Sequence, residues 1–314
     1  MNPYHYESSK QVADLRLKKD TPRSLHYTVE FPSAVNTGYV ENGVVRGEYY
    51  WPKVSHKTPL AILAHGMGDV SMIPCKLLAR ALLKQGIACF LPYLTVHSTR
   101  IPKAMREHFP YLTPDEWFLS YRLSVIDIRQ IIDWADSRTE LDRDRIAAVG
   151  ISFGGFISAI AMGIDSRIKA GVFITTGGNS EKMNRLGKAA IYRKGYERTE
   201  AEHHDIESSY ASYLAEVAEK GFENVVPERQ SFLNDPLTFA TYLKGRPVLM
   251  INALKDKYIP REAATELWQA SGQPPIKWIP SGHSTIWLWY PVIRRDITAF
   301  LKSSFTSTNP PAIT

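Results

Sequence analysis

The sequence of 314 residues contains little cysteine and no long apolar run. Its two cysteines, Cys75 and Cys89, fall in a helix-like and a strand-like segment, so we expect small core residues and no disulfide. A membrane-spanning helix needs ~20 apolar residues, and the nearest run, residues 286–290, is far too short. Residues 1–20 are polar and lack the apolar stretch of a signal peptide. These absences predict a chain with no membrane span and a cytoplasmic location.

Long runs of one charge are also missing. The chain has 38 basic and 32 acidic residues, a formal net charge of +6, but no basic run exceeds two residues, as at 18–19 and 294–295. A nucleic-acid partner is therefore not expected. The adjacent His203, His204 and Asp205 would point to different faces of a helix, and no further ligand cluster accompanies them. We expect neither a metal nor an organic cofactor.

The chain does contain a regular alternation of apolar and amphipathic segments. Its 44% hydrophobic content and its length suit one globular α/β domain with an insertion. Segments typical of strands cover residues 25–35, 44–51, 59–64, 87–91, 146–150, 170–175, 247–252 and 276–279. Segments typical of helices cover residues 73–85, 114–137, 153–162, 261–270 and 285–301. This order predicts an α/β fold with a mostly parallel, doubly wound sheet of about eight strands, edged by an antiparallel hairpin.

Three segments fall outside this alternation. Residues 1–24 have no clear core pattern and are interpreted as an N-terminal arm. Residues 177–246 are polar, largely helical in pattern and without a strand. A segment of this length is too long for one crossover between strands, so we interpret it as an inserted helical cap. Residues 303–314 are interpreted as a C-terminal tail. The core would then comprise residues 25–176 and 247–302.

A serine stands at the most informative turn of the chain. The sequence Gly150-Ile151-Ser152-Phe153-Gly154 joins an apolar strand segment to a helical pattern. Flanking glycines permit a sharp strand-to-helix turn that presents the serine hydroxyl at the sheet edge. A helix start with serine as its cap would have the same local shape, so the pentapeptide alone leaves both interpretations open.

A nucleophilic serine needs a histidine base, and that histidine needs a carboxylate to orient it. Asp256 and His283 each lie in a loop directly after a late strand segment, the place that brings them to the same sheet edge as Ser152. Asp256 could instead be a turn residue, and His283 a core histidine. Asp235 is a second candidate carboxylate, but Asn234-Asp235-Pro236 is more typical of a turn.

Together these motifs resemble the α/β-hydrolase superfamily, in particular its dienelactone-hydrolase-like, acetyl-esterase-like and prolyl-oligopeptidase-like branches. The resemblance rests on residues 64–69 (AHGMGD), on the turn at Ser152 and on the Asp256 and His283 loops, and it spans about residues 58–300 without the cap. It implies a Ser152–His283–Asp256 catalytic triad. It also implies an oxyanion hole formed by the backbone N–H groups of Phe153 and Met67. His65 is expected to support this loop.

The resemblance implies a serine hydrolase that cleaves carboxylic esters of small molecules through an acyl-enzyme. A peptidase or thioesterase of the same fold is the nearest alternative, and a non-catalytic binding protein is the alternative from another class. The Pro- and His-rich stretch of residues 92–114 supplies His97 and Arg100 as candidates for binding a polar substrate group. Trp287, just after His283, is a candidate pocket residue or a packing residue of the last helix. The oligomeric state and the particular ester are not specified by these patterns.

Overall fold

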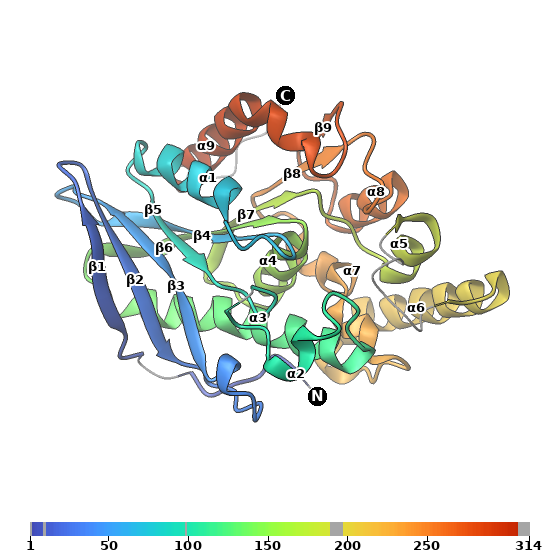
Figure 1. The fold of residues 1–314 in the computed structure, drawn as a ribbon. Coiled ribbons are helices and arrows are strands. Elements are labelled where there is room, and N and C mark those ends of the chain that lie inside the picture. Colours follow the sequence, from blue (N-terminus) through green and yellow to red (C-terminus); the bar gives the residue numbers. More distant parts are fainter. Residues whose placement is uncertain (1, 9–10, 98, 189–196, 307–314) are drawn as a thin grey trace.

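A mixed sheet of nine strands forms the centre of the computed structural model, which describes residues 2–8, 11–97, 99–188 and 197–306. The strands lie in the order β1-β2-β3-β5-β4-β6-β7-β8-β9 (Figure 1). Their bounds are β1 Asp14–Asp20, β2 Ser24–Pro32, β3 Val44–Pro52, β4 Thr58–Ala64, β5 Ala88–Pro92, β6 Leu141–Ile151, β7 Ile168–Ile174, β8 Val248–Ala253 and β9 Ile276–Ile279. From β5 to β9 all neighbours pair in parallel, so the predicted α/β fold with a mostly parallel sheet is confirmed.

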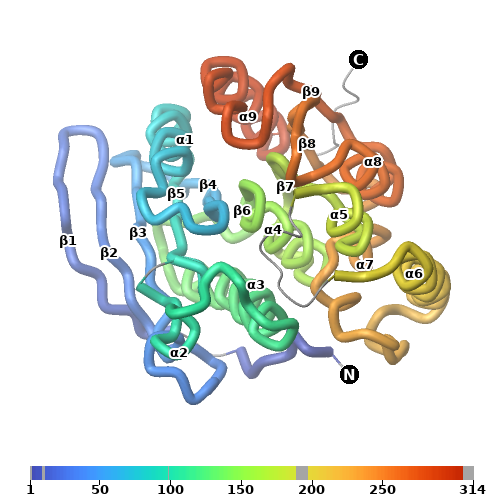
Figure 2. The backbone as a smooth tube through the Cα atoms, turned by 45° about the vertical axis from the view of Figure 1, so that its right-hand side comes forward, coloured from blue at the N-terminus to red at the C-terminus, as the bar shows by residue number. Residues whose placement is uncertain are grey.

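Helices cover both faces of the sheet. Their bounds are α1 Ile73–Leu83, α2 Lys103–Arg106, α3 Pro114–Asp136, α4 Phe153–Ile164, α5 Ser180–Leu186, α6 Glu200–Lys220, α7 Pro236–Phe239, α8 Arg261–Ala270 and α9 Tyr290–Thr306. Apolar side chains of α1 and α9 pack on one face, and those of α3, α4 and α8 pack on the other. Figure 2 shows α1 and α9 on the opposite side of the sheet from α3. Strand β4 is buried over its whole length, which explains its uninterrupted apolar sequence. Cys75 and Cys89 are buried free thiols on the α1 face, as expected.

The N-terminal edge differs from the sequence prediction. Strands β1, β2 and β3 are antiparallel, and β3 is also antiparallel to β5, so the predicted edge hairpin is confirmed. The sheet nevertheless has nine strands instead of about eight, because β1 lies within the segment interpreted as an arm. Six of its seven residues are exposed, and charged side chains of this kind are typical of an edge strand. This strand forms through backbone hydrogen bonds to β2. Such bonds do not require a hydrophobic pattern in the sequence, so the pattern did not reveal the strand.

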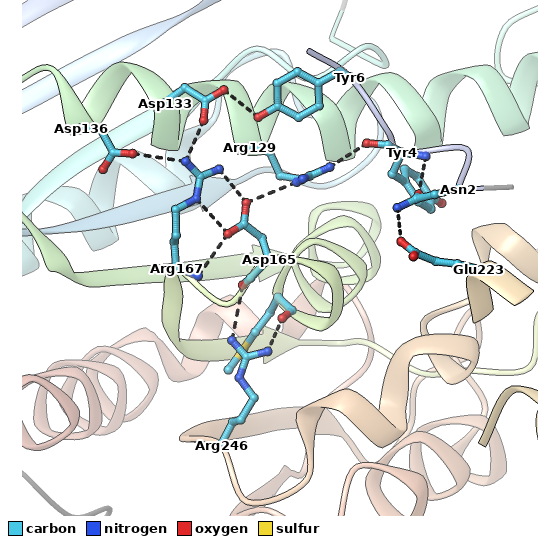
Figure 3. A network of polar contacts seen from close by, with 11 residues as sticks. Asn2, Tyr4, Tyr6, Arg129, Asp133, Asp136, Asp165, Arg167, Glu223 and Arg246 are labelled. Carbon is cyan, nitrogen blue, oxygen red and sulfur yellow. Dashed lines mark hydrogen bonds and ion pairs between the residues drawn. The ribbon is translucent and has the colours of Figure 1, made fainter. Parts of the chain in front are cut away.

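The residues before β1 are fixed to the body of the protein. Tyr4 is fully buried, and its hydroxyl donates to the backbone oxygen of Leu233 at 2.6 Å. The Tyr6 hydroxyl donates to Asp133 of α3 at 2.7 Å, and Arg129 of the same helix donates to the backbone oxygen of Tyr4. Figure 3 shows the Tyr6–Asp133 and Arg129–Tyr4 contacts beside the ion pairs that Arg167 makes with acidic residues. The N-terminal segment therefore ties α3 to the segment that follows β7.

Between β7 and β8 the chain makes a helical excursion. The described residues of 177–246 form α5, α6 and α7 and short 3-10 turns, with no strand among them. Figure 1 shows α6 at the opposite side of the molecule from β1. Residues 189–196 of the predicted cap and 307–314 of the predicted tail lie outside the described residues. The division into core and cap stays a prediction, but the tail was predicted to begin too early, since α9 continues to Thr306. None of the helices that the structure describes is both long and apolar enough to cross a membrane.

Candidate active site

Ser152 occupies a tight turn between β6 and α4. Its backbone has φ 53° and ψ −118°, a combination that is uncommon for a residue with a side chain, and its N–H donates to the Ile174 oxygen at 2.8 Å. The turn requires residues without a side chain at positions 150 and 154. A Cβ atom at Gly150 would lie 2.1 Å from the Gly154 oxygen, and one at Gly154 would lie 2.2 Å from the Ala64 oxygen. Both glycines are therefore required by close backbone approach.

Three side chains from separate loops form a hydrogen-bonded series at this turn. His283 Nε2 lies 2.9 Å from Ser152 Oγ, and His283 Nδ1 lies 2.7 Å from Asp256 Oδ2. Asp256 Oδ1 accepts hydrogen bonds from the N–H groups of Tyr258 and Ile259, both at 2.9 Å. The carboxylate is thus fixed in direction and only 3% exposed. Because Oδ2 is an acceptor, Nδ1 carries the proton of neutral His283, and Nε2 faces the serine hydroxyl as a hydrogen-bond acceptor.

The two loops that carry Asp256 and His283 are joined by backbone hydrogen bonds. Leu254 N–H donates to the Ile279 oxygen at 2.8 Å, and Lys255 N–H donates to the Ser281 oxygen at 2.9 Å. These bonds continue the β8–β9 pairing beyond the strand ends. They hold Asp256 and His283 at a fixed separation. Asp235, the second candidate carboxylate, instead caps α7 and accepts from Leu237 N–H at 2.9 Å.

The loop after β4 lies beside Ser152 and is held by His65. The His65 side chain is fully buried, and its Nε2 accepts from Leu94 N–H at 3.2 Å. Nδ1 therefore carries the proton and donates to the Gly66 oxygen at 2.7 Å. Burial lowers the pKa of His65 to about 4, so the ring is neutral near pH 7. This geometry agrees with the expected supporting role of His65. Met67, which follows Gly66 in this loop, lines the pocket at Ser152.

The pocket at Ser152 has a volume of about 230 Å³ and is mainly apolar. Its lining comprises Met67, Trp117, Tyr121, Ser152, Phe153, Phe156, Met183, Tyr258, Ile259, His283 and Ser284. The rings of Tyr121 and Phe153 meet edge to face with centroids 5.0 Å apart. The pocket thus contains all the predicted triad and oxyanion-hole residues except Asp256, which lies behind His283.

Sequence reasoning missed most of the apolar wall. Trp117 and Tyr121 lie one turn apart on α3, a helix whose pattern indicated only packing against the sheet. Met183 comes from α5, within the predicted cap. Phe156 could have been found from its position, because it lies one helical turn after Ser152 at the start of α4.

The structure does not bring the three candidate substrate-binding residues to this pocket. Arg100 is fully buried and pairs with the equally buried Asp127 at 2.5 Å. His97 is 4% exposed and stacks on Tyr93, with centroids 4.4 Å apart. Trp287 packs against the apolar cluster of α1 and α9. His97 and Arg100 are thus internal contacts of a folded segment, which the composition of residues 92–114 did not reveal.

No group of three or more histidine, cysteine, aspartate or glutamate side chains is arranged as a metal site within residues 2–8, 11–97, 99–188 and 197–306. His203, which was considered as a ligand at the sequence level, contacts Glu181 through Nδ1 at 2.5 Å. The same carboxylate contacts Arg198 at 3.1 Å. This cluster lies in the helical segment between β7 and β8, and its members are hydrogen-bond and ion-pair partners of Glu181.

Comparison with known proteins agrees with the fold. Residues 59–199 match the family model described as the alpha/beta hydrolase fold. No curated protein matches the sequence significantly. An acetyl xylan esterase from Paenibacillus sp. R4 superposes with a TM-score of 0.65 at 21% identity, over 93% of this chain and 89% of the other.

Two further solved structures are similar. Acetyl Xylan Esterase 1 from Thermoanaerobacterium sp. JW/SL YS485 gives a TM-score of 0.63 at 16% identity, over 95% of this chain and 91% of the other. The Pyrococcus horikoshii acylaminoacyl peptidase gives 0.59 at 14% identity, over 97% of this chain but only 43% of the other. The chain therefore has the α/β-hydrolase fold. At these identities the likeness concerns the fold and leaves the reaction to be argued from the site.

Proposed function

We propose that this protein is a serine hydrolase that cleaves carboxylic esters of small molecules. The observation that carries the proposal is the hydrogen-bonded series Ser152–His283–Asp256 at the wall of an apolar pocket. The esterases among the structural relatives support an ester over other acyl compounds. A peptidase receives less support, because the acylaminoacyl peptidase has much additional chain that this protein does not match.

In the proposed reaction Ser152 Oγ attacks the ester carbonyl carbon while its proton passes to His283 Nε2. Asp256 stabilises the resulting imidazolium through Nδ1. The backbone N–H groups of Phe153 and Met67 donate to the negative carbonyl oxygen, and such donors stabilise the transition state strongly because they are already oriented. When the tetrahedral intermediate collapses, the ester C–O bond breaks and His283 Nε2 returns the proton to the leaving alkoxide.

The second half of the reaction repeats these steps with water. His283 Nε2 takes a proton from a water molecule, whose oxygen attacks the acyl carbon of Ser152. The second intermediate then releases the carboxylic acid and restores the serine hydroxyl. The apolar side chains of Met67, Phe156 and Met183 exclude bulk water from the acyl group. No metal or organic cofactor takes part in this scheme.

The test is labelling by a fluorophosphonate together with hydrolysis of p-nitrophenyl esters of increasing acyl length. Ser152→Ala should abolish both. Ser158→Ala is the matched control, since this buried serine also lies on α4 and its hydroxyl bonds to no residue that the structure describes. Wild-type protein that neither reacts with the probe nor exceeds Ser152→Ala in turnover would refute the proposal. Faster cleavage of anilides than of esters would favour a peptidase.

Asp256→Asn tests the orienting role of the carboxylate. The Asn carbonyl would keep the bonds from Tyr258 and Ile259, so its NH₂ group would face His283 and force the proton onto Nε2. His283 could then no longer accept the serine proton, and a comparable change lowers kcat by about 10⁴-fold in another triad. Equal kcat in wild type and Asp256→Asn would contradict the proposed triad.

A further inference from the structure

A second cavity lies against the pocket at Ser152 and shares two of its walls. Its volume is about 320 Å³, within the range of roughly 300–1,000 Å³ that is usual for small-molecule sites. Trp117 and Tyr121 line both spaces, so the two cavities are neighbours across one turn of α3. The rest of its lining comes mainly from the segment between β7 and β8. A substrate group that passes these two rings would leave the apolar pocket and enter this cavity.

The second cavity combines aromatic rings with hydrogen-bonding groups. The rings of Tyr210 and Phe232 stack on each other in its wall, with centroids 4.5 Å apart. Amide and hydroxyl groups are contributed by Gln230, Ser231 and Asn234, which belong to the same 3-10 turn as Phe232. Aromatic faces beside uncharged donors and acceptors suit a ring that is apolar on its faces and carries hydroxyls at its rim.

One polar atom in this lining lacks a partner. Asn234 is 8% exposed, and its buried Oδ1 accepts no hydrogen bond from any residue that the structure describes. Buried amide oxygens are normally bonded, so this one indicates a donor that none of the described residues supplies. The surrounding backbone is well fixed, because neighbouring Leu233 accepts from the Tyr4 hydroxyl and Phe232 accepts from Thr238 Oγ1.

The charges of the cavity leave no strong net field. Glu181 is compensated by Arg198 at 3.1 Å and also contacts His203 Nδ1. Buried Asp235 accepts four hydrogen bonds, from Asn179 N, Leu237 N, and the N–H and hydroxyl of Ser180. At the exposed rim Asp115 and Arg229 have opposite signs. An ionic ligand would find no unbalanced partner here, which favours a neutral one.

We propose that the second cavity binds a neutral polyhydroxylated leaving group, such as a sugar ring, while the apolar pocket holds the acyl group. A polyol forms esters through its own hydroxyl, so the hydroxylated part of such a substrate is always the alcohol. The apolar pocket at Ser152 and the polar-aromatic cavity beside it match these two halves. This inference rests on the proposed esterase activity.

The test compares two acetate esters, one whose leaving group carries hydroxyls and ether oxygens and one whose leaving group carries neither. A mono-O-acetylated methyl pentoside and cyclohexyl acetate both carry a six-membered ring, and we expect kcat/KM to be at least tenfold higher for the pentoside. A site that hydrogen-bonds a substrate hydroxyl discriminates against the analogue without it. Equal values for the two esters would overturn the proposal. Preference for acetylcholine over the pentoside would also overturn it, in favour of a cationic ligand.

Two variants locate the effect. Ser231→Trp fills the cavity from its exposed rim and should lower kcat/KM for the pentoside ester at least tenfold, through KM, while p-nitrophenyl acetate hydrolysis changes less than twofold. Asn234→Leu should reduce the preference for the pentoside over cyclohexyl acetate about tenfold. Ser212→Trp, at an exposed position on α6 outside the cavity lining, is the control. Equal effects of Ser231→Trp on all esters would contradict the assignment.

Failure of the esterase proposal is recognised separately. If no ester is cleaved and no fluorophosphonate label is found, the proposed function is wrong. Calorimetric titration with methyl pentoside still tests the cavity in that case, since binding should occur to wild type and be weakened at least tenfold in Ser231→Trp. Absence of binding, or unchanged binding in the variant, would overturn the cavity assignment as well.

Discussion

The backbone of Gly154 packs directly against the carbonyl group of Ala64, so the first turn of α4 touches the end of β4. A methyl group at residue 154 would lie 2.2 Å from the Ala64 oxygen, which is much closer than van der Waals contact. Both partners are backbone atoms of buried elements and cannot rotate away. The contact fixes the height of the serine turn above the loop that begins at His65.

Gly154→Ala should therefore lose both stability and activity. Overpacking in a core costs about 1–3 kcal/mol, and displacement of α4 would misplace Ser152 relative to His283. Urea unfolding and p-nitrophenyl acetate kinetics measure the two effects. Gly43→Ala is the control, because its φ is −67° and its added methyl would meet only the Val40 oxygen at 3.5 Å. Similar behaviour of the two variants would contradict the packing argument.

Substitutions at Met67 separate a backbone role from a side-chain role. If Met67 N–H is an oxyanion donor, Met67→Pro removes it and should lower kcat by about 100- to 1000-fold. Met67→Ala keeps the N–H and should change kcat only mildly. Stopped assays on folded protein, checked by circular dichroism, give the comparison. A large loss of kcat in Met67→Ala would show that the side chain, not the backbone donor, is what matters.

The buried His65 ring should make stability depend on acid. Burial lowers its pKa to about 4, whereas an unfolded chain protonates histidine near pH 6.5. As the pH falls below about 6.5 the unfolded state binds a proton first, so stability declines until about pH 4, by about 3 kcal/mol in total. Urea unfolding at pH 7, 5.5 and 4.5 measures this slope.

His65→Asn should lower stability at pH 7 and flatten the slope between pH 6.5 and 4. The exposed His56 provides the control, and His56→Asn should keep the wild-type slope. A slope that persists in His65→Asn would mean that other groups dominate the acid response.

Arg100 should contribute to the stability of the fold and not to substrate binding. Arg100→Met leaves Asp127 as a fully buried carboxylate without its ion pair, a change that typically costs 3–5 kcal/mol. The double variant Arg100→Met/Asp127→Leu should recover much of that loss. KM for neutral and anionic esters should stay as in wild type, in contrast to the substrate contact expected from the sequence. A selective rise in KM for anionic esters would restore that expectation.

Much of the fold follows from local patterns, and what was missed is not local. The continuous apolar sequence of β4 and the amphipathic pattern of α8 predict both elements at or near their observed bounds. β1 has no such pattern, since its formation depends on backbone pairing with β2. Charged edge strands of this kind resemble a loop in sequence.

The residues of the site also separate into those that local sequence patterns predict and those that they do not. Ser152, Asp256 and His283 could be predicted because each follows a strand with a recognisable turn. Trp117 and Tyr121 could not, because a helix residue that faces a cavity has the same spacing as one that faces the sheet. Arg100 was misjudged for the opposite reason, since a charged residue in a proline-rich stretch is usually exposed and this one is buried.

The backbone of Ser152 carries one more consequence. Its φ of 53° with ψ of −118° is a conformation that glycine adopts freely and that costs other residues about 1–3 kcal/mol. The proposed reaction thus requires serine at position 152, whereas the backbone conformation there is most favourable for glycine. Selection of this protein for thermal resistance, without selection for turnover, should therefore replace Ser152, the proposed nucleophile, and leave the surrounding fold intact.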